Sequence, residues 1–169
     1  MAINYQEKYW RELDQLKIHV IYLGYYLEST IKIDRTLKII LAISSSGSIA
    51  GWAIWTNYQF IWASIIAISQ VINAIKGYLP YSKRLKSLFG ITNDFGALFL
   101  AMETDWFNVS EGKYSNEEIH KIHMKFKETR RQIIQKHLGT SPLPNNDKFM
   151  QLSIEEAKLY FSNFYGSEE

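Results

Sequence analysis

The 169-residue chain contains no cysteine, three prolines and nine glycines. The lack of cysteine excludes disulfide bonds, zinc sites with thiolate ligands and cysteine nucleophiles. So few prolines and glycines favour long helices. An excess of charge of one sign is also missing, because 19 Lys and Arg residues oppose 17 Asp and Glu residues. The formal net charge of +2 gives no electrostatic reason for direct nucleic-acid binding, and we expect none.

Charged residues and histidine are absent from a long internal stretch, residues 39–75. A helix that spans a bilayer needs about 20 apolar residues, so this stretch has the length for two. We expect it to divide at Thr56 and Asn57 into segments 37–55 and 58–78, which form a transmembrane helical hairpin. Aromatic residues gather near the division, as is typical of a membrane interface: Trp52, Trp55, Tyr58, Phe60 and Trp62.

Basic residues flank both ends of this hairpin, at Lys32, Arg35, Lys38, Lys76, Lys83, Arg84 and Lys86. The positive-inside rule then predicts that both termini lie in the cytoplasm. The alternative is a hairpin buried inside a water-soluble helical bundle.

Small and polar residues interrupt both segments of the hairpin. In the first, Gly47 and Gly51 lie one turn apart beside two serines, which predicts close helix packing at these glycines. In the second, Trp62, Ser69 and Asn73 share a helical face, with Gln70 at its edge. These side chains either hydrogen-bond across helices or line a water-filled path. The pore-lining candidates are Ser44, Ser48, Trp62, Ser69, Gln70 and Asn73.

The sequences on both sides of the hairpin are also predicted to be helical, and no segment is predicted to be a strand. Apolar residues recur every three or four positions over 5–33 and 81–102. Ser115 and Glu118 have the spacing of a capping box, which predicts a helix ended by Gly139 and Pro142. Ser153 and Glu156 have the same spacing and predict the start of a last helix that reaches about Tyr165.

The expected fold class is therefore all-α, a transmembrane helical hairpin with a cytoplasmic helical bundle formed by both flanks. Three parts follow: an N-terminal cytoplasmic amphipathic helix (1–36), the two-helix transmembrane hairpin (37–78) and a C-terminal cytoplasmic helical region (79–169).

Chemical motifs are sparse. There is no glycine-rich phosphate loop and no G-x-S-x-G nucleophile motif. His120 and His123 lie one helical turn apart, a spacing that can share a metal, but a solvated face is the preferred interpretation, and we expect no metal and no cofactor. Arg131 and His137 fit the R-x(4–6)-H pattern of the HEPN class of helical ribonucleases, as Arg130 does. An arginine could stabilise a phosphorane while a histidine transfers a proton. For Arg131 and His137 a solvated or subunit-facing surface is again the preferred interpretation, so enzymatic activity is the less favoured hypothesis.

The whole chain, over about residues 5–165, resembles the SLATT-type two-transmembrane effectors of bacterial antiphage defence. The order of parts carries the resemblance: an aromatic-rich helix, a tight hairpin, a long helix with a tryptophan segment at Glu103–Trp106, and a terminal run from Glu155 through Tyr160 to Tyr165. The R-x5-H element adds a narrower similarity to the HEPN-like membrane pore proteins encoded beside type VI CRISPR nucleases. The resemblance implies an oligomeric pore in the bacterial inner membrane that disturbs membrane potential when an infection sensor is triggered.

One hairpin cannot enclose a pore, so this hypothesis requires a homo-oligomer, with a ring larger than a dimer and a lipid bilayer around it. An RNA-guided nuclease or another infection sensor would be the functional partner. The alternatives are a membrane-tethered HEPN-like ribonuclease, with Arg131 and His137 as the catalytic candidates, and a non-catalytic membrane scaffold.

Overall fold

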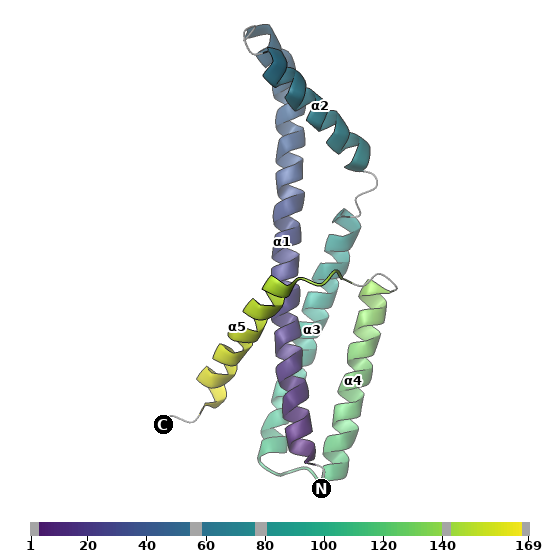
Figure 1. Ribbon diagram of the computed structural model, residues 1–169. Coiled ribbons are helices and arrows are strands. Elements are labelled where there is room, and N and C mark those ends of the chain that lie inside the picture. The colour runs from purple at the N-terminus through teal and green to yellow at the C-terminus, as the bar shows by residue number, and fades with distance from the viewer. Residues whose placement is uncertain (1–3, 55–58, 77–80, 140–142, 167–169) are drawn as a thin grey trace. The chain divides into compact units, whose positions relative to one another are not determined.

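A computed structural model describes residues 4–54, 59–76, 81–139 and 143–166, and the side chains of these residues except those of 43–54, 59, 75–76 and 81–83. Its helices are α1 (Tyr5–Ile54), α2 (Gln59–Lys76), α3 (Tyr81–Ser110), α4 (Asn116–Leu138) and α5 (Asp147–Tyr165) (Figure 1). The described ranges contain no strand. The predicted all-α class is confirmed, while the predicted division at Thr56 and Asn57 lies outside the described residues.

The helices belong to two compact units. Unit 1 combines residues 1–27 with residues 87–169, so it holds the first part of α1 together with most of α3 and all of α4 and α5. Unit 2 comprises residues 28–86 and holds the rest of α1 and α2.

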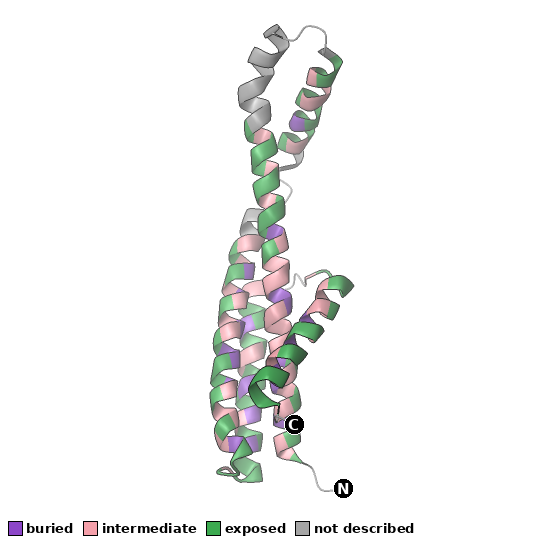
Figure 2. Cartoon of the chain, turned by 90° about the vertical axis from the view of Figure 1, so that its left-hand side faces the viewer, coloured by how far each residue is buried: buried purple, intermediate pink, exposed green. Residues whose placement is uncertain are grey.

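The core of unit 1 is built from the apolar stripes of its helices. Buried residues in α1 and α3 recur every three or four positions, which is the period that lines one face of a helix. The buried positions lie on the sides of these helices that face one another (Figure 2). The Tyr9 hydroxyl also donates a hydrogen bond of 2.9 Å to the Met102 carbonyl, which ties α1 to α3 inside the core. The core residues are Tyr9, Leu13, Leu16, Leu23, Ile91, Phe95, Leu98, Phe99, Met102, Val109, Ile119, Phe126, Ile133 and Phe161.

Helix α4 begins and ends where the sequence predicts. Ser115 accepts a hydrogen bond from the Glu118 backbone while the Glu118 carboxylate accepts one from the Ser115 backbone, so the capping box is formed. Gly139 follows the helix with a φ of 54°, a conformation that side chains other than glycine rarely adopt. The preceding helix, α3, continues past the apolar period over 81–102 and ends at Ser110.

The predicted start of the last helix is wrong. Helix α5 begins at Asp147, and its N-cap is Asn146, whose side chain accepts a 3.1 Å hydrogen bond from the Phe149 backbone. Ser153 lies inside the helix, is fully buried and donates to the Phe149 carbonyl at 2.6 Å. Asn is as good an N-cap as Ser, so a capping-box spacing alone could not choose between the two positions.

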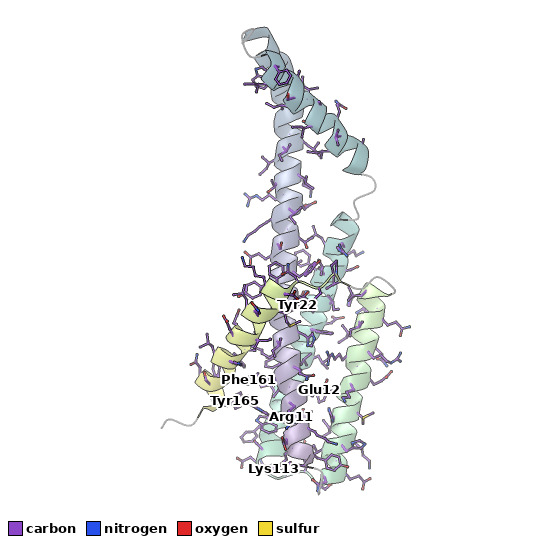
Figure 3. All side chains as sticks on the ribbon, viewed as in Figure 1. Arg11, Glu12, Tyr22, Lys113, Phe161 and Tyr165 are labelled. Carbon is purple, nitrogen blue, oxygen red and sulfur yellow. The ribbon has the colours of Figure 1, made fainter. Side chains whose placement is uncertain are left out.

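Aromatic residues attach α5 to α1 and α3 within unit 1. The Trp10 ring lies 4.9 Å from the Phe161 ring and 5.4 Å from the Tyr165 ring, both edge to face. Phe161 and Tyr165 both belong to the second half of α5 (Figure 3). The Tyr160 hydroxyl donates to Glu103 of α3 at 2.7 Å, which adds a polar contact beside these rings.

The length and composition of the helices contradict the predicted location in the inner membrane with both termini cytoplasmic. Within the described residues, none of them has both the length and the apolar character that crossing a membrane requires. Helix α2 has 18 residues, and polar side chains interrupt it at Ser64, Ser69, Gln70 and Asn73. The described side chains of α1 in unit 2 include charges on Glu28, Lys32, Asp34, Arg35 and Lys38.

Candidate functional site

The polar residues of α2 that are predicted to line a path differ in burial. Ser69 is 6% exposed and donates a 2.7 Å hydrogen bond to the Ile65 carbonyl of its own helix, and Trp62, two turns earlier, is half-buried. Gln70 and Asn73 are exposed. The structure therefore buries Ser69 and half-buries Trp62 but leaves both amides exposed, although Asn73 shares the helical face of Ser69. The side chains of Ser44, Gly47, Ser48 and Gly51 lie outside those described, so their pore-lining and packing roles stay predictions.

The outward side of α2 is apolar. Phe60, Ile61, Ile68 and Val71 are 85%, 53%, 57% and 59% exposed. At about 100° per residue these four positions fall within about 100° of one another, on an arc that also contains Ser64 and is centred about 130° from Ser69. Burying one such side chain is worth roughly 1.5–3 kcal/mol, so the stripe is a strong driving force for association. Sequence reasoning concentrated on the polar face of this segment and did not single out the apolar one.

Arg131 and His137 point to different sides of α4. The Arg131 guanidinium pairs with Glu128 at 2.7 Å and its side chain is 64% exposed, whereas the His137 side chain is 14% exposed. Six helical positions separate them by about 120°, so one chain does not join them in one site. The Arg131 hydrogen bonds lower the pKa of Glu128 to about 2, which keeps this pair charged.

Arg130, the other arginine that fits the pattern, lies almost exactly two turns before His137 and shares its face. Its guanidinium is already engaged, because Nη1 donates to Oε1 of Glu12 in α1 at 2.8 Å. His137 is engaged elsewhere, with Asp94 of α3, at 2.7 Å. Within one chain, each residue of this second pair is thus held by a contact to another helix of unit 1.

Glu12 is the centre of a charged cluster that sequence reasoning missed. Its side chain is 14% exposed and Figure 3 shows it on the side of α1 toward α4. Besides Arg130, the carboxylate lies 3.8 Å from Nζ of Lys127 and 3.7 Å from Nε2 of His123. Nothing in the spacing of the sequence identifies the partners of Glu12, which lie on a helix more than 100 residues later.

His123 does not lie on a solvated face, so that prediction is wrong for it. Ile119 and Phe126, one turn before and after it, are both buried, and His123 shares their side of α4 with only 8% exposure. Burial, followed by the nearby Lys127 charge, lowers the pKa of His123, so its imidazole is neutral at pH 7. Its Nε2 atom is buried without a hydrogen-bond partner. This apolar spacing was the signal that could have revealed its burial.

His120, by contrast, is exposed, and its ring meets the Tyr5 ring edge to face at 5.6 Å. Across the described part of the chain, no three His, Asp or Glu side chains are placed to hold a metal ion together.

A groove of about 360 Å³ lies beside the Glu12 cluster, between α1 and α4. Each helix contributes a stripe at spacings of three and four residues, the arrangement that brings residues to one helical face. The lining residues are Lys8, Arg11, Glu12 and Gln15 of α1 and His120, His123, Met124 and Lys127 of α4.

Comparison of the chain with protein-family models, with curated proteins and with solved structures finds no match. The resemblance to SLATT-type effectors therefore remains an expectation drawn from the order of parts.

Proposed function

We propose that the protein is a homo-oligomeric, non-enzymatic effector of bacterial antiphage defence, whose assembled form acts as a pore when an infection sensor triggers it. The outward apolar stripe of α2 is the observation that carries this proposal. A resident position in the inner membrane is no part of it.

The stripe supports assembly because its side chains are large and apolar and form two pairs on one side of α2, Phe60 with Ile61 and, about two turns later, Ile68 with Val71. Phe60, Ile61, Ile68 and Val71 lie in contact with solvent on one side of an 18-residue helix. Exposed apolar side chains gathered on one side of a helix are typical of interaction sites in proteins. Stripe against stripe would give only a two-fold dimer, so a closed ring requires that the stripe of each copy packs against a different surface of the next copy around an axis. The polar groups of unit 2, among them Gln70 and Asn73, are then candidates for the lining of the enclosed path.

The first test is the mass of the purified particle, with a matched pair of variants. Ile68→Lys with Val71→Lys places two charges in the stripe, whereas Gln70→Lys with Asn73→Lys places two charges at exposed polar positions of the same helix. We expect a defined oligomer larger than a dimer in the unchanged protein and in the polar-site variant, and a smaller species in the stripe variant. A monomer in all three proteins would overturn the assembly.

The second test is conduction. We expect the assembled protein to release a fluorescent dye from phospholipid vesicles, and the stripe variant to release much less. An oligomer that releases no dye would leave the assembly intact and overturn the pore, which would favour the scaffold alternative.

The ribonuclease alternative makes a different prediction. Arg131→Ala and His137→Ala would abolish RNA cleavage with vesicle leakage unchanged if these residues formed a catalytic pair across two chains. Unchanged leakage without any RNA cleavage by the parent protein is what the pore proposal expects.

A further inference from the structure

The outer face of α3 carries a stripe of apolar and small uncharged residues. Three large side chains in it, Phe89, Leu100 and Phe107, are 48%, 62% and 61% exposed. At about 100° per residue all members of the stripe fall within about 80° of one another, along roughly 27 Å of helix. The stripe consists of Phe89, Asn93, Ala97, Leu100, Thr104 and Phe107, all of them exposed.

Neighbouring helices of unit 1 flank this stripe without covering it. The charged residues of α3 within 87–110 lie outside its arc. On one side, Asp94 is hydrogen-bonded to His137 of α4 at 2.7 Å. On the other, Glu103 accepts a hydrogen bond of 2.7 Å from Tyr160 of α5. The stripe is thus an uncharged, exposed surface of α3 between α4 and α5.

The order of residues in the stripe is nearly symmetric about its middle, between positions 98 and 99. A phenylalanine stands at each end, a polar uncharged residue lies about one turn inside each end, and an alanine and a leucine lie on the two sides of the middle. In a two-fold contact each residue of one copy meets its symmetry counterpart in the other. The pairs in an antiparallel contact would be Phe89 with Phe107, Asn93 with Thr104 and Ala97 with Leu100.

We propose that the outer face of α3 docks a second copy of this chain, antiparallel about that two-fold axis. Each phenylalanine then covers another, the Asn93 amide donates to the Thr104 hydroxyl, and the small Ala97 receives the larger Leu100. A parallel pair would set alanine against alanine and leucine against leucine, which leaves a gap at one level and crowding at the next.

The contact lies in unit 1 and uses no residue of α2, so it is independent of the proposed pore. It is also small, because only three large apolar side chains of each copy take part. Interfaces below the standard size are typical of weak, transient association. We therefore expect a dimer that cross-linking captures more readily than a measurement of particle mass.

The test uses the absence of cysteine from the chain. Asn93→Cys and Thr104→Cys are prepared as two full-length proteins and oxidised with copper phenanthroline, each alone and as a mixture. In the antiparallel pair, the two copies of either position lie roughly 16 Å apart along the helices, beyond the reach of a disulfide, whereas position 93 faces position 104. On a non-reducing gel we expect a covalent dimer in the mixture and at least about tenfold less in either protein alone.

Three further variants serve as controls. Gln132→Cys, at an exposed position of α4, should form no more dimer when mixed with Asn93→Cys than either does alone. Leu100→Lys places a charge at the middle of the stripe and should abolish the cross-link with the helical circular dichroism unchanged, because this residue is 62% exposed. Ile68→Lys with Val71→Lys should leave the cross-link intact, which separates this contact from the assembly of α2.

Four results would overturn the proposal. The mixture could form no covalent dimer, or the Gln132→Cys mixture could form as much, which would indicate random collision. Each single-cysteine protein could cross-link alone as well as in the mixture, which would indicate a parallel pair. Loss of the cross-link in the α2 variant would show that the α3 face does not dock a second copy by itself.

Discussion

His137 of α4 and Asp94 of α3 are joined by a hydrogen bond of 2.7 Å between Nε2 and Oδ2. The Lys136 ammonium reaches the same carboxylate oxygen at 3.0 Å. Gly90 lies one turn before Asp94 and makes room for the imidazole, because a Cβ there would lie 2.3 Å from Cε1 of His137. The last turn of α4 is thus held against α3 by the Asp94 carboxylate, and the absence of a side chain at Gly90 allows the close approach.

Alanine at position 90 should break this arrangement. Alanine normally stabilises a helix by about 0.5–1 kcal/mol relative to glycine. At Gly96 of the same helix a Cβ meets nothing within 4 Å, so Gly96→Ala should show this gain. Gly90→Ala has to displace the His137 ring from Asp94 and should lose the gain or reverse it. Urea unfolding measures both variants, and equal stabilisation by the two would contradict the close approach.

The Asp94 pair should make stability depend on pH in acid. Hydrogen bonds from His137, and then from Lys136, lower the pKa of Asp94 from its usual 3.8 in the folded chain. A lowered folded pKa gives stability that is present above the unfolded value and is lost as the pH falls through the folded value. The difference in unfolding free energy between the parent protein and Asp94→Asn should therefore be largest above pH 4 and shrink below it. Urea titrations between pH 2.5 and 6 measure it, and a difference that grows toward low pH would contradict the assignment.

Much of the fold could be predicted because it depends on sequence patterns within a few neighbouring residues. The all-α class follows from apolar periodicity, and the bounds of α4 follow from a capping box and a glycine in the left-handed region. The start of α5 was missed because Asn146 and Ser153 both offer a capping side chain, and only the packing of Ser153 against the core decides between them. The membrane location failed because absence of charge over a stretch is a weaker property than the apolar character a spanning helix needs.

The candidate site was less predictable, because its contacts join distant parts of the chain. Glu12 meets Arg130, and Asp94 meets His137, across separations that no spacing rule covers. The R-x(4–6)-H pattern gave Arg131 and His137, but it does not state which helical face each residue occupies. His123 was recoverable, since its buried neighbours Ile119 and Phe126 reveal the core-facing side of α4.

Removal of the Glu12 carboxylate should be costly. Its side chain is 14% exposed and that of Arg130 is 24% exposed, so Glu12→Ala leaves a largely buried guanidinium without its partner. We expect a loss of about 2–4 kcal/mol in the free energy of unfolding. Glu7→Ala is the control, because Glu7 pairs with Arg11 on the exposed surface of the same helix and its loss should cost about 0.5 kcal/mol or less. Equal effects of the two substitutions in urea unfolding would show that the Glu12 cluster does not stabilise unit 1.

The N-cap of α5 can be located by two substitutions. Asn146 accepts the Phe149 N–H at 3.1 Å, so Asn146→Ala should cost about 1 kcal/mol of stability by leaving that donor without its partner. Ser153→Ala removes a hydroxyl whose hydrogen bond goes to the Phe149 carbonyl of the same helix. Alanine also keeps a small side chain at this fully buried position, so the substitution should cost less stability than Asn146→Ala. Chemical unfolding followed by circular dichroism ranks the two. If Ser153→Ala were the more damaging change, the helix would begin at the capping box that the sequence suggests, and Asn146 would lie in the connection that precedes it.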